Sequence, residues 1–144
     1  MGWFNARPDA ANSIAGRKRP LANMGPMLVT RDGQAVAAIG APGGRRIISC
    51  VVQLIINLCE RGMSAESAIS APRLDASGHA LLASEELAGV LDGAANDRVT
   101  WSPVATQHAP FGYELARPVL VTRDGTGELR AVTDPRVRGS AFAL

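Results

Sequence analysis

The chain has 144 residues, of which 47% are hydrophobic and 4% aromatic, and its formal net charge is +2. This length and apolar fraction predict a single domain over residues 1–144 with an aliphatic core, and they argue against a disordered chain. The charge is uneven, since residues 1–61 carry eight basic and three acidic side chains whereas residues 62–144 carry seven and ten.

The first 26 residues contain three prolines and few periodic apolar positions, which predicts an irregular segment that wraps another part of the structure. The basic run "GRKRP" at 16–20 is short, has no interleaved aromatic residues and belongs to no predicted helix. We therefore expect a solvated turn that attracts a small anion, and no nucleic-acid partner. The N-terminus lacks the basic and apolar regions of a signal peptide, so the expected location is cytoplasmic.

The six residues LVTRDG occur twice, at 28–33 and at 120–125. Asp-Gly between two β-type runs is a strong hairpin signal, and it predicts strands at 27–31 and 35–40. The run 117–134 repeats the pattern and predicts a second hairpin, and "RVTWSPV" at 98–104 reads as a further strand. A repeat this short can arise from shared turn chemistry alone, so it does not establish duplication.

Three helices are predicted between the hairpins, at 44–61, from Ser64 to Ser70, and at 84–95. The first is apolar around most of its circumference, so we expect it to be sandwiched between other elements. Its apolar run of 13 residues is too short to span a bilayer, and no membrane association is expected. Helices between two hairpins predict an α+β fold with helices packed on an antiparallel sheet, and the all-round apolar helix suggests a partner layer.

The cysteine and histidine residues predict no metal site and no cofactor. Cys50 and Cys59 lie on one predicted helix about 13 Å apart along its axis, too far for a disulfide, so both are expected to be buried reduced thiols. His79 and His108 are isolated, and no Cys/His spacing suits zinc.

The segment Pro42-Gly43-Gly44 joins a predicted strand to a predicted helix. Backbone N–H groups at a helix start favour negative charge, and two that converge on one point can form an oxyanion hole for acyl transfer. On spacing alone, the simpler interpretation is a turn that requires positive φ, and both remain open. The chain has no Gly-x-Ser-x-Gly elbow, and since it starts at Met1 we expect no N-terminal Ser, Thr or Cys nucleophile in it.

Residues 11–74 resemble the C-terminal part of the small subunit of the γ-glutamyltransferase (γ-glutamyltranspeptidase) family. The resemblance rests on "NSIAGRKRPLANMGP", "GAPGGRRII" and "APR", which match the family's Asn-x-Ile-x-Pro-Gly-Lys-Arg-Pro-Leu-Ser-Ser-Met-x-Pro, Gly-x-Pro-Gly-Gly-x-x-Ile-Ile and Ala-Pro-Arg patterns in order and spacing. The closing "DPR" resembles the family's Asp-Pro-Arg tail. The resemblance covers nearly the whole chain and is weakest over 75–115.

This resemblance implies part of an N-terminal nucleophile (Ntn) hydrolase αββα sandwich, in which antiparallel sheets stack between helical layers. In that family a threonine attacks a γ-glutamyl amide, and water or an amino acid resolves the acyl-enzyme. Gly43 and Gly44 match the oxyanion-hole glycines. Ala22 and Asn23 stand at the two serines that bind the substrate α-carboxylate, with Met24 beside them. Trp3 stands where an aspartate would bind the substrate α-amino group.

The departures from the family pattern concern the nucleophile and the substrate. The family's threonine lies upstream of the matching segment, so we expect it to come from an N-terminal or large-subunit chain, or the chain to act as a homo-oligomer. The expected substrate is a small γ-glutamyl or other acyl amide. Trp3 removes an ionic partner and Ala22 removes a hydroxyl, which argues against glutathione as the preferred substrate and favours a bulkier, less charged acyl group. The alternative is a catalytically dead stand-alone module, or a truncated gene product with a binding or scaffold role.

Overall fold

The computed structural model describes residues 4–5, 7–78, 80–94, 101–104 and 115–136, and predictions that fall on other residues lie outside it. One sheet is antiparallel and four-stranded, in the order β1 (Met27–Arg31), β2 (Gln34–Gly40), β6 (Val119–Arg123), β7 (Leu129–Thr133). A smaller sheet has the order β3 (Leu74–Asp75), β4 (Leu81–Ser84), β5 (Trp101–Val104). The helical elements are the 3₁₀ turns η1 (Gly44–Arg46) and η2 (Glu85–Leu87), and the helices α1 (Ile47–Cys59), α2 (Ala65–Ser70) and α3 (Ala88–Ala94).

Both predicted hairpins form, and they lie side by side in the four-stranded sheet, where β2 pairs with β6. Their turns differ although the sequence LVTRDG is shared. In the first, Asp32 has φ 52° and Gly33 has φ 77°, which gives the tight two-residue turn expected of Asp-Gly. In the second, Asp124 accepts hydrogen bonds from the hydroxyl and N–H of Thr126 across a longer loop, and these bonds hold the pKa of Asp124 below its usual value.

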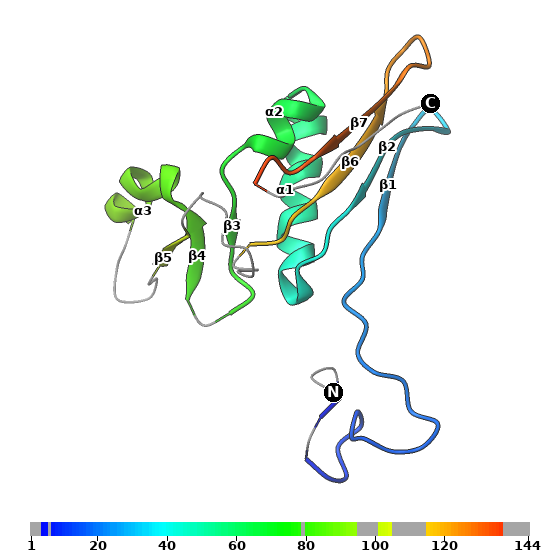
Figure 1. The fold of residues 1–144 in the computed structure, drawn as a ribbon, viewed down its shortest axis with the longest axis vertical. Helices are drawn as coiled ribbons and strands as arrows, with labels where there is room; N and C mark the ends of the chain where they lie inside the picture. The colour runs from blue at the N-terminus through cyan, green and yellow to red at the C-terminus, as the bar shows by residue number, and fades with distance from the viewer. Residues whose placement is uncertain (1–3, 6, 79, 95–100, 105–114, 137–144) are drawn as a thin grey trace.

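The core lies between the four-stranded sheet and the helices α1 and α2, which cover one face of it (Figure 1). Alternate strand residues point to the helices, as the two-residue period of a strand requires. The most buried apolar side chains are Leu54 of α1, Ile69 of α2 and Leu120 of β6, each at most 1% exposed. The Ser64 side chain accepts a hydrogen bond from Ser67 N–H, which confirms the predicted cap of α2.

The predicted sandwiching of the first helix is confirmed only in part within the described residues, because α1 lies between the two sheets but is not covered all round. One stripe of α1 stays open, with Ile48, Val52 and Ile56 exposed by 56%, 48% and 40%. These residues lie four apart and therefore on one face of the helix. Cys59 is also exposed, which corrects its prediction as a buried thiol, whereas Cys50 is buried. The helix itself starts after a 3₁₀ turn and ends at Cys59, two residues earlier than predicted.

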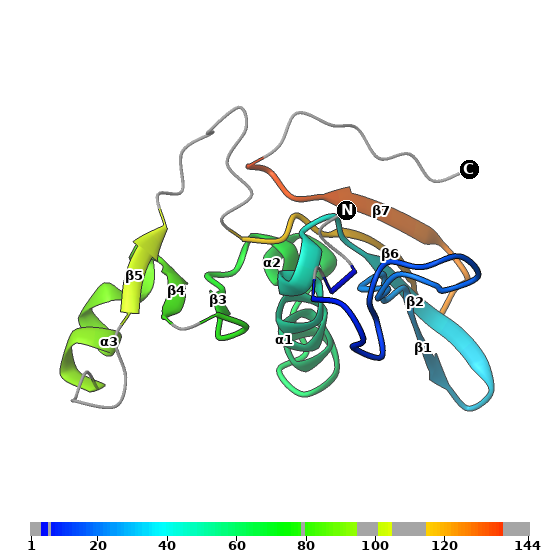
Figure 2. The ribbon, with the colours of Figure 1, turned by 90° about the horizontal axis from the view of Figure 1, so that it is seen from below.

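The small sheet lies on the other side of α1 and α2 from the four-stranded sheet (Figure 2). It is not wholly antiparallel as predicted, because β4 and β5 pair in parallel. The predicted helix at 84–95 is the turn η2 followed by α3, and residues 98–100 of the predicted strand lie outside the described residues. The side-chain amide of Gln53 on α1 donates to the Leu74 carbonyl and accepts from its N–H, which joins α1 to β3.

The described residues before β1 form turns and one isolated bridge, between Asn5 and Ser13, and no helix or strand. The Ser13 hydroxyl closes this loop by donating to the carbonyls of Arg7 and Ala10. The "GRKRP" turn at 16–20 is exposed, as predicted. In the part of the chain that the structure describes, no helix has the length and apolar character needed to cross a membrane.

Candidate active site

The segment 42–44, called the oxyanion loop below after the role that the sequence predicts for it, leads from β2 into η1 in a conformation that only glycine adopts easily. Gly43 has φ 156° and ψ 9°, and Gly44 has φ 64°. A Cβ on Gly43 would lie 2.7 Å from the Cα of Ala116 and would overlap its Cβ. Gly43 is therefore required twice, once by its backbone angles and once by its close contact with Ala116.

The backbone amides of the oxyanion loop have no hydrogen-bond acceptor within the described residues. Among the described residues, no hydrogen bond has Gly43 N–H or Gly44 N–H as its donor, and both glycines are half-buried. Two consecutive amides at the start of a helical segment favour a bound negative charge. Arg45 and Arg46 follow directly and add two positive side chains to the same turn. The local chemistry is that of a small anion site.

A cleft of about 340 Å³ opens beside Gly43. Its charged residues are Arg45, Arg46 and Asp75, and the Nε of Arg46 lies 3.8 Å from Oδ2 of Asp75. The Ser77 hydroxyl donates to the same oxygen over 2.8 Å. Asp75 is 2% exposed, and its Oδ1 has no hydrogen-bond partner within the described residues. The cleft thus combines space, positive charge and one unsatisfied acceptor.

The other residues predicted for substrate binding all lie in the segment before β1. Gly25 abuts the first turn of α1, since a Cβ on it would lie 3.1 Å from Cδ1 of Ile48. Asn23 is half-buried and Met24 is 80% exposed, and within the described residues no hydrogen bond joins Ala22, Asn23 or Met24 to the oxyanion loop. Trp3 lies outside the described residues.

Sequence reasoning missed a buried ion pair behind the oxyanion loop. Arg73 of the Ala-Pro-Arg motif donates from Nη2 to Oδ2 of Asp134, the aspartate of the Asp-Pro-Arg motif, and both side chains are at most 2% exposed. Arg136 joins them, with its Nη1 3.5 Å from Oδ2 of Asp134. Each motif was visible in the sequence, but Arg73 and Asp134 are 61 positions apart, and nothing in the sequence shows that they meet.

The Cys50 thiol lies near the loop but is not reactive, and no metal-binding cluster is found among the described residues. The Cys50 thiol lies 3.9 Å from the Ala116 carbonyl oxygen, and burial raises its pKa to about 11. It is therefore protonated near neutral pH and does not serve as a thiolate nucleophile. Within the described ranges, no group of three or more His, Cys, Asp or Glu side chains is arranged to hold a metal ion.

Comparison with known proteins identifies the family. A family model described as Gamma-glutamyltranspeptidase matches residues 2–144, nearly the whole chain. The chain belongs to the γ-glutamyltranspeptidase family. The α+β fold is thereby part of the Ntn-hydrolase architecture, to which the described residues contribute the four-stranded antiparallel sheet and its covering helices.

Three relatives illustrate how this chain compares with others. It is 31% identical over 146 residues to the glutathione hydrolase proenzyme of Escherichia coli (strain K12), covering 94% of this chain and 24% of that protein. It is 39% identical over 71 residues to the Acylase ACY 1 proenzyme of Pseudomonas sp. (strain V22), covering 49% of this chain and 13% of that protein. The solved γ-glutamyltranspeptidase from Pseudomonas nitroreducens complexed with L-DON aligns with a TM-score of 0.75 at 25% identity, over 94% of this chain and 69% of that chain.

These alignments cover only part of the related proteins. The chain spans about a quarter of the length of the Escherichia coli proenzyme and less of the acylase proenzyme. Family membership and fold follow from the matches, whereas the activity, substrate and partners of a whole enzyme are matters for proposal.

Proposed function

We propose that this chain supplies the oxyanion-stabilising part of the active site in a γ-glutamyltransferase-like Ntn hydrolase, as the C-terminal portion of its small subunit. The reaction would be transfer or hydrolysis of a γ-glutamyl or other acyl amide through an acyl-enzyme. The threonine nucleophile would come from a partner segment, and the naming of the relatives as proenzymes supports such an assembly. The observation that carries the proposal is that the backbone N–H groups of Gly43 and Gly44 donate no hydrogen bond among the described residues.

The geometry suits the charge that develops during acyl transfer. When a nucleophile attacks the amide carbon, the carbonyl oxygen becomes an anion, and each preorganised donor contributes about 3 to 4 kcal/mol to the transition state. Gly43 and Gly44 would supply two such donors, with the guanidinium groups of Arg45 and Arg46 nearby. The cleft that Gly43 lines offers space for the amine portion of the substrate.

The acyl portion of the substrate would be less charged than a γ-glutamyl group. Asn23 can donate hydrogen bonds to a carboxylate, but Ala22 has no hydroxyl and Trp3 offers no negative charge to an ammonium group. The similarity to a protein named as an acylase agrees with this preference. We therefore propose a neutral acyl amide as the better substrate and glutathione as the poorer one.

Reconstitution tests the proposal. The full chain is mixed with the threonine-bearing segment of a family proenzyme, and hydrolysis of γ-glutamyl-p-nitroanilide and of a neutral acyl-p-nitroanilide is followed. We expect turnover only in the mixture, and a kcat at least about tenfold lower for Gly43→Ala because its Cβ displaces the amides. Gly62→Ala is the matched control, since Gly62 also has positive φ (62°) but open space around it.

A folded mixture without turnover above the chain alone would reject the proposed activity. It would favour the alternative of a catalytically dead binding module. Equal loss of activity in Gly43→Ala and Gly62→Ala would instead reject the assignment of the oxyanion loop, because backbone strain anywhere in the chain would then explain the loss.

A further inference from the structure

The position of the oxyanion loop depends on Ala116. Ala116 is 1% exposed, and its Cα and Cβ occupy the space where a side chain on Gly43 would be. The next residue, Arg117, donates its N–H to the Pro42 carbonyl over 3.0 Å, and Arg46 N–H donates to the Gly43 carbonyl over 3.2 Å. The loop is therefore packed against one short backbone segment, and a shift of that segment would shift the Gly43 and Gly44 amides.

The Ala116 carbonyl is held from the opposite side by Arg73. The Nη2 of Arg73 donates to this oxygen over 3.3 Å, and the same nitrogen donates to Asp134. The Nη1 of Arg73 donates to the Ile69 carbonyl over 2.7 Å, at the end of α2. One buried guanidinium thus joins α2, the end of β7 and the segment that contacts Gly43.

The Arg73 residue is also held through its backbone. Its backbone N–H donates to the Ser84 hydroxyl over 3.0 Å, and its backbone carbonyl accepts from Ser84 N–H over 2.8 Å. Asp134 is fully buried, and its N–H donates to the Pro118 carbonyl, two residues after Ala116. Asp134 therefore orients Arg73 and also anchors the segment before β6 that carries Ala116.

Stability alone does not explain a pair like this. Replacing a buried ion pair with apolar residues of similar volume is often neutral or stabilising. The planar guanidinium, however, presents several donors in a fixed arrangement that a lysine or an apolar residue does not reproduce. The Arg73–Asp134 pair thus adds a directional, charged support to the Ala116 carbonyl, which otherwise has the weaker contact of the Cys50 thiol, and apolar packing would not replace it.

We infer that Arg73 and Asp134 are positioning residues, which act through Ala116 to hold the Gly43 and Gly44 amides in place. This inference rests on the proposed function for its catalytic meaning. It assigns one shared role to the Ala-Pro-Arg and Asp-Pro-Arg motifs, which lie far apart in the sequence and meet behind the oxyanion loop. Neither residue contacts the open cleft, since the residues that line it are Gly43, Arg45, Arg46, Asp75, Ser77, Gly78 and Leu82.

Hydrogen exchange on the full chain tests the coupling directly. The Arg46 and Arg117 amides report the loop because both donate to it. In Arg73→Lys, and in Ala116→Gly, which keeps the ion pair but removes the contacting methyl group, we expect exchange at these two amides to be at least tenfold faster. Amides in the β1–β2 pair should change by less than twofold. Glu66→Gln, which breaks the exposed Arg130–Glu66 pair on α2, should leave all of them within twofold.

The reconstituted enzyme supplies the second readout. We expect Ala116→Gly to lower kcat at least tenfold with KM within twofold, because substrate contacts remain and only the amide geometry loosens. Should Arg73→Lys fail to fold, Asp134→Asn, which keeps the side-chain size but removes the charge that orients Arg73, takes its place in both measurements. Unchanged exchange at Arg46 and Arg117, exchange that rises equally across the chain, or local loosening with unchanged kcat would each overturn the inference.

The two proposals fail differently. If Gly43→Ala retains full activity while loop exchange still responds to Arg73→Lys, the oxyanion assignment is wrong although the mechanical coupling is real. If Gly43→Ala loses activity but the loop ignores both Arg73 and Ala116, the oxyanion assignment stands and the positioning inference falls.

Discussion

At the scale of single residues, the site was predictable where the requirement is local. Two consecutive glycines before a helix signal an unusual backbone, and Gly43 and Gly44 indeed have positive φ. The contact that makes Gly43 irreplaceable comes from Ala116, and nothing in the sequence marks that alanine. The same holds for Asp75, whose burial depends on the small sheet and on Arg46 rather than on its neighbours in the chain.

The buried Cys50 thiol predicts a pH dependence of stability. Burial raises its pKa from 9.0 to about 11, so the folded state keeps the proton more tightly than the unfolded state does. This stabilisation is complete below pH 9 and is lost as the pH rises toward 11, which amounts to roughly 2 to 3 kcal/mol at 1.36 kcal/mol per pKa unit. Denaturant unfolding from pH 8 to 11 measures it.

Two cysteine variants separate this effect from the ionisation of other groups. Cys50→Ala should remove the steeper part of the decline above pH 9, whereas Cys59→Ala should keep it because Cys59 is exposed. Identical pH slopes for the wild type and Cys50→Ala would show that the thiol does not contribute.

At the scale of elements, local turn and cap chemistry gave the hairpins and α2 correctly. The identical LVTRDG copies form different turns because the first is followed directly by its second strand, whereas the second is followed by Thr126 and Gly127. The parallel pairing of β4 with β5 was not predictable, since short strands carry no mark of their direction. The sequence correctly predicts that α1 is apolar on most sides. It does not show which side is buried, because that depends on the sheets that pack against the helix.

Two adjacent valines test the two faces of α1. Val51 is 2% exposed and Val52 is 48% exposed, so the same substitution probes opposite sides of one helix turn. Val51→Ala should lower the free energy of unfolding by about 1.5 to 3 kcal/mol, from lost apolar burial and the cavity left behind. Val52→Ala should change it by less than about 0.5 kcal/mol, because alanine's higher helix propensity offsets the small loss of contact. Urea unfolding of both variants decides, and similar losses would mean that the outer stripe is already covered in solution.

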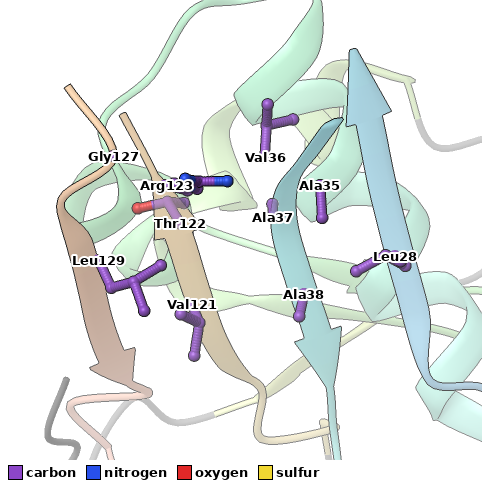
Figure 3. A pocket seen from close by; sticks show the side chains of 10 residues that line it. All are labelled: Leu28, Ala35, Val36, Ala37, Ala38, Val121, Thr122, Arg123, Gly127 and Leu129. Atoms are coloured by element: carbon purple, nitrogen blue, oxygen red, sulfur yellow. The ribbon is translucent and has the colours of Figure 1, made fainter. Parts of the chain in front are cut away.

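At the scale of the whole chain, the described residues expose a second apolar surface on the face of the sheet away from the helices. A groove of about 340 Å³ there, called the outer groove, is lined by Leu28, Ala35, Val36, Ala37, Ala38, Val121, Thr122, Arg123, Gly127 and Leu129 (Figure 3). The strand register places Leu28, Ala38 and Val121 in one row across the sheet. Apolar surface of this extent is typical of an interface. In an αββα sandwich, this is the face on which a second sheet packs.

A lysine in this groove should therefore affect assembly more than folding. Val121→Lys places a charge on a surface that is open in the chain alone, so its free energy of unfolding should change by less than about 1 kcal/mol. Packing a second sheet over it would bury the charge without a partner, which is strongly unfavourable. The partner segment of the proposed enzyme should raise the free energy of unfolding of the wild type, by about 2.7 kcal/mol when the partner is present at a hundred times its Kd. In Val121→Lys this stabilisation by the partner should be lost. Val90→Lys is the control, because Val90 is 72% exposed on α3, away from the groove. Equal stabilisation of both variants by the partner would place the second layer elsewhere, and α1 with its open stripe would then be the surface that the rest of the enzyme covers.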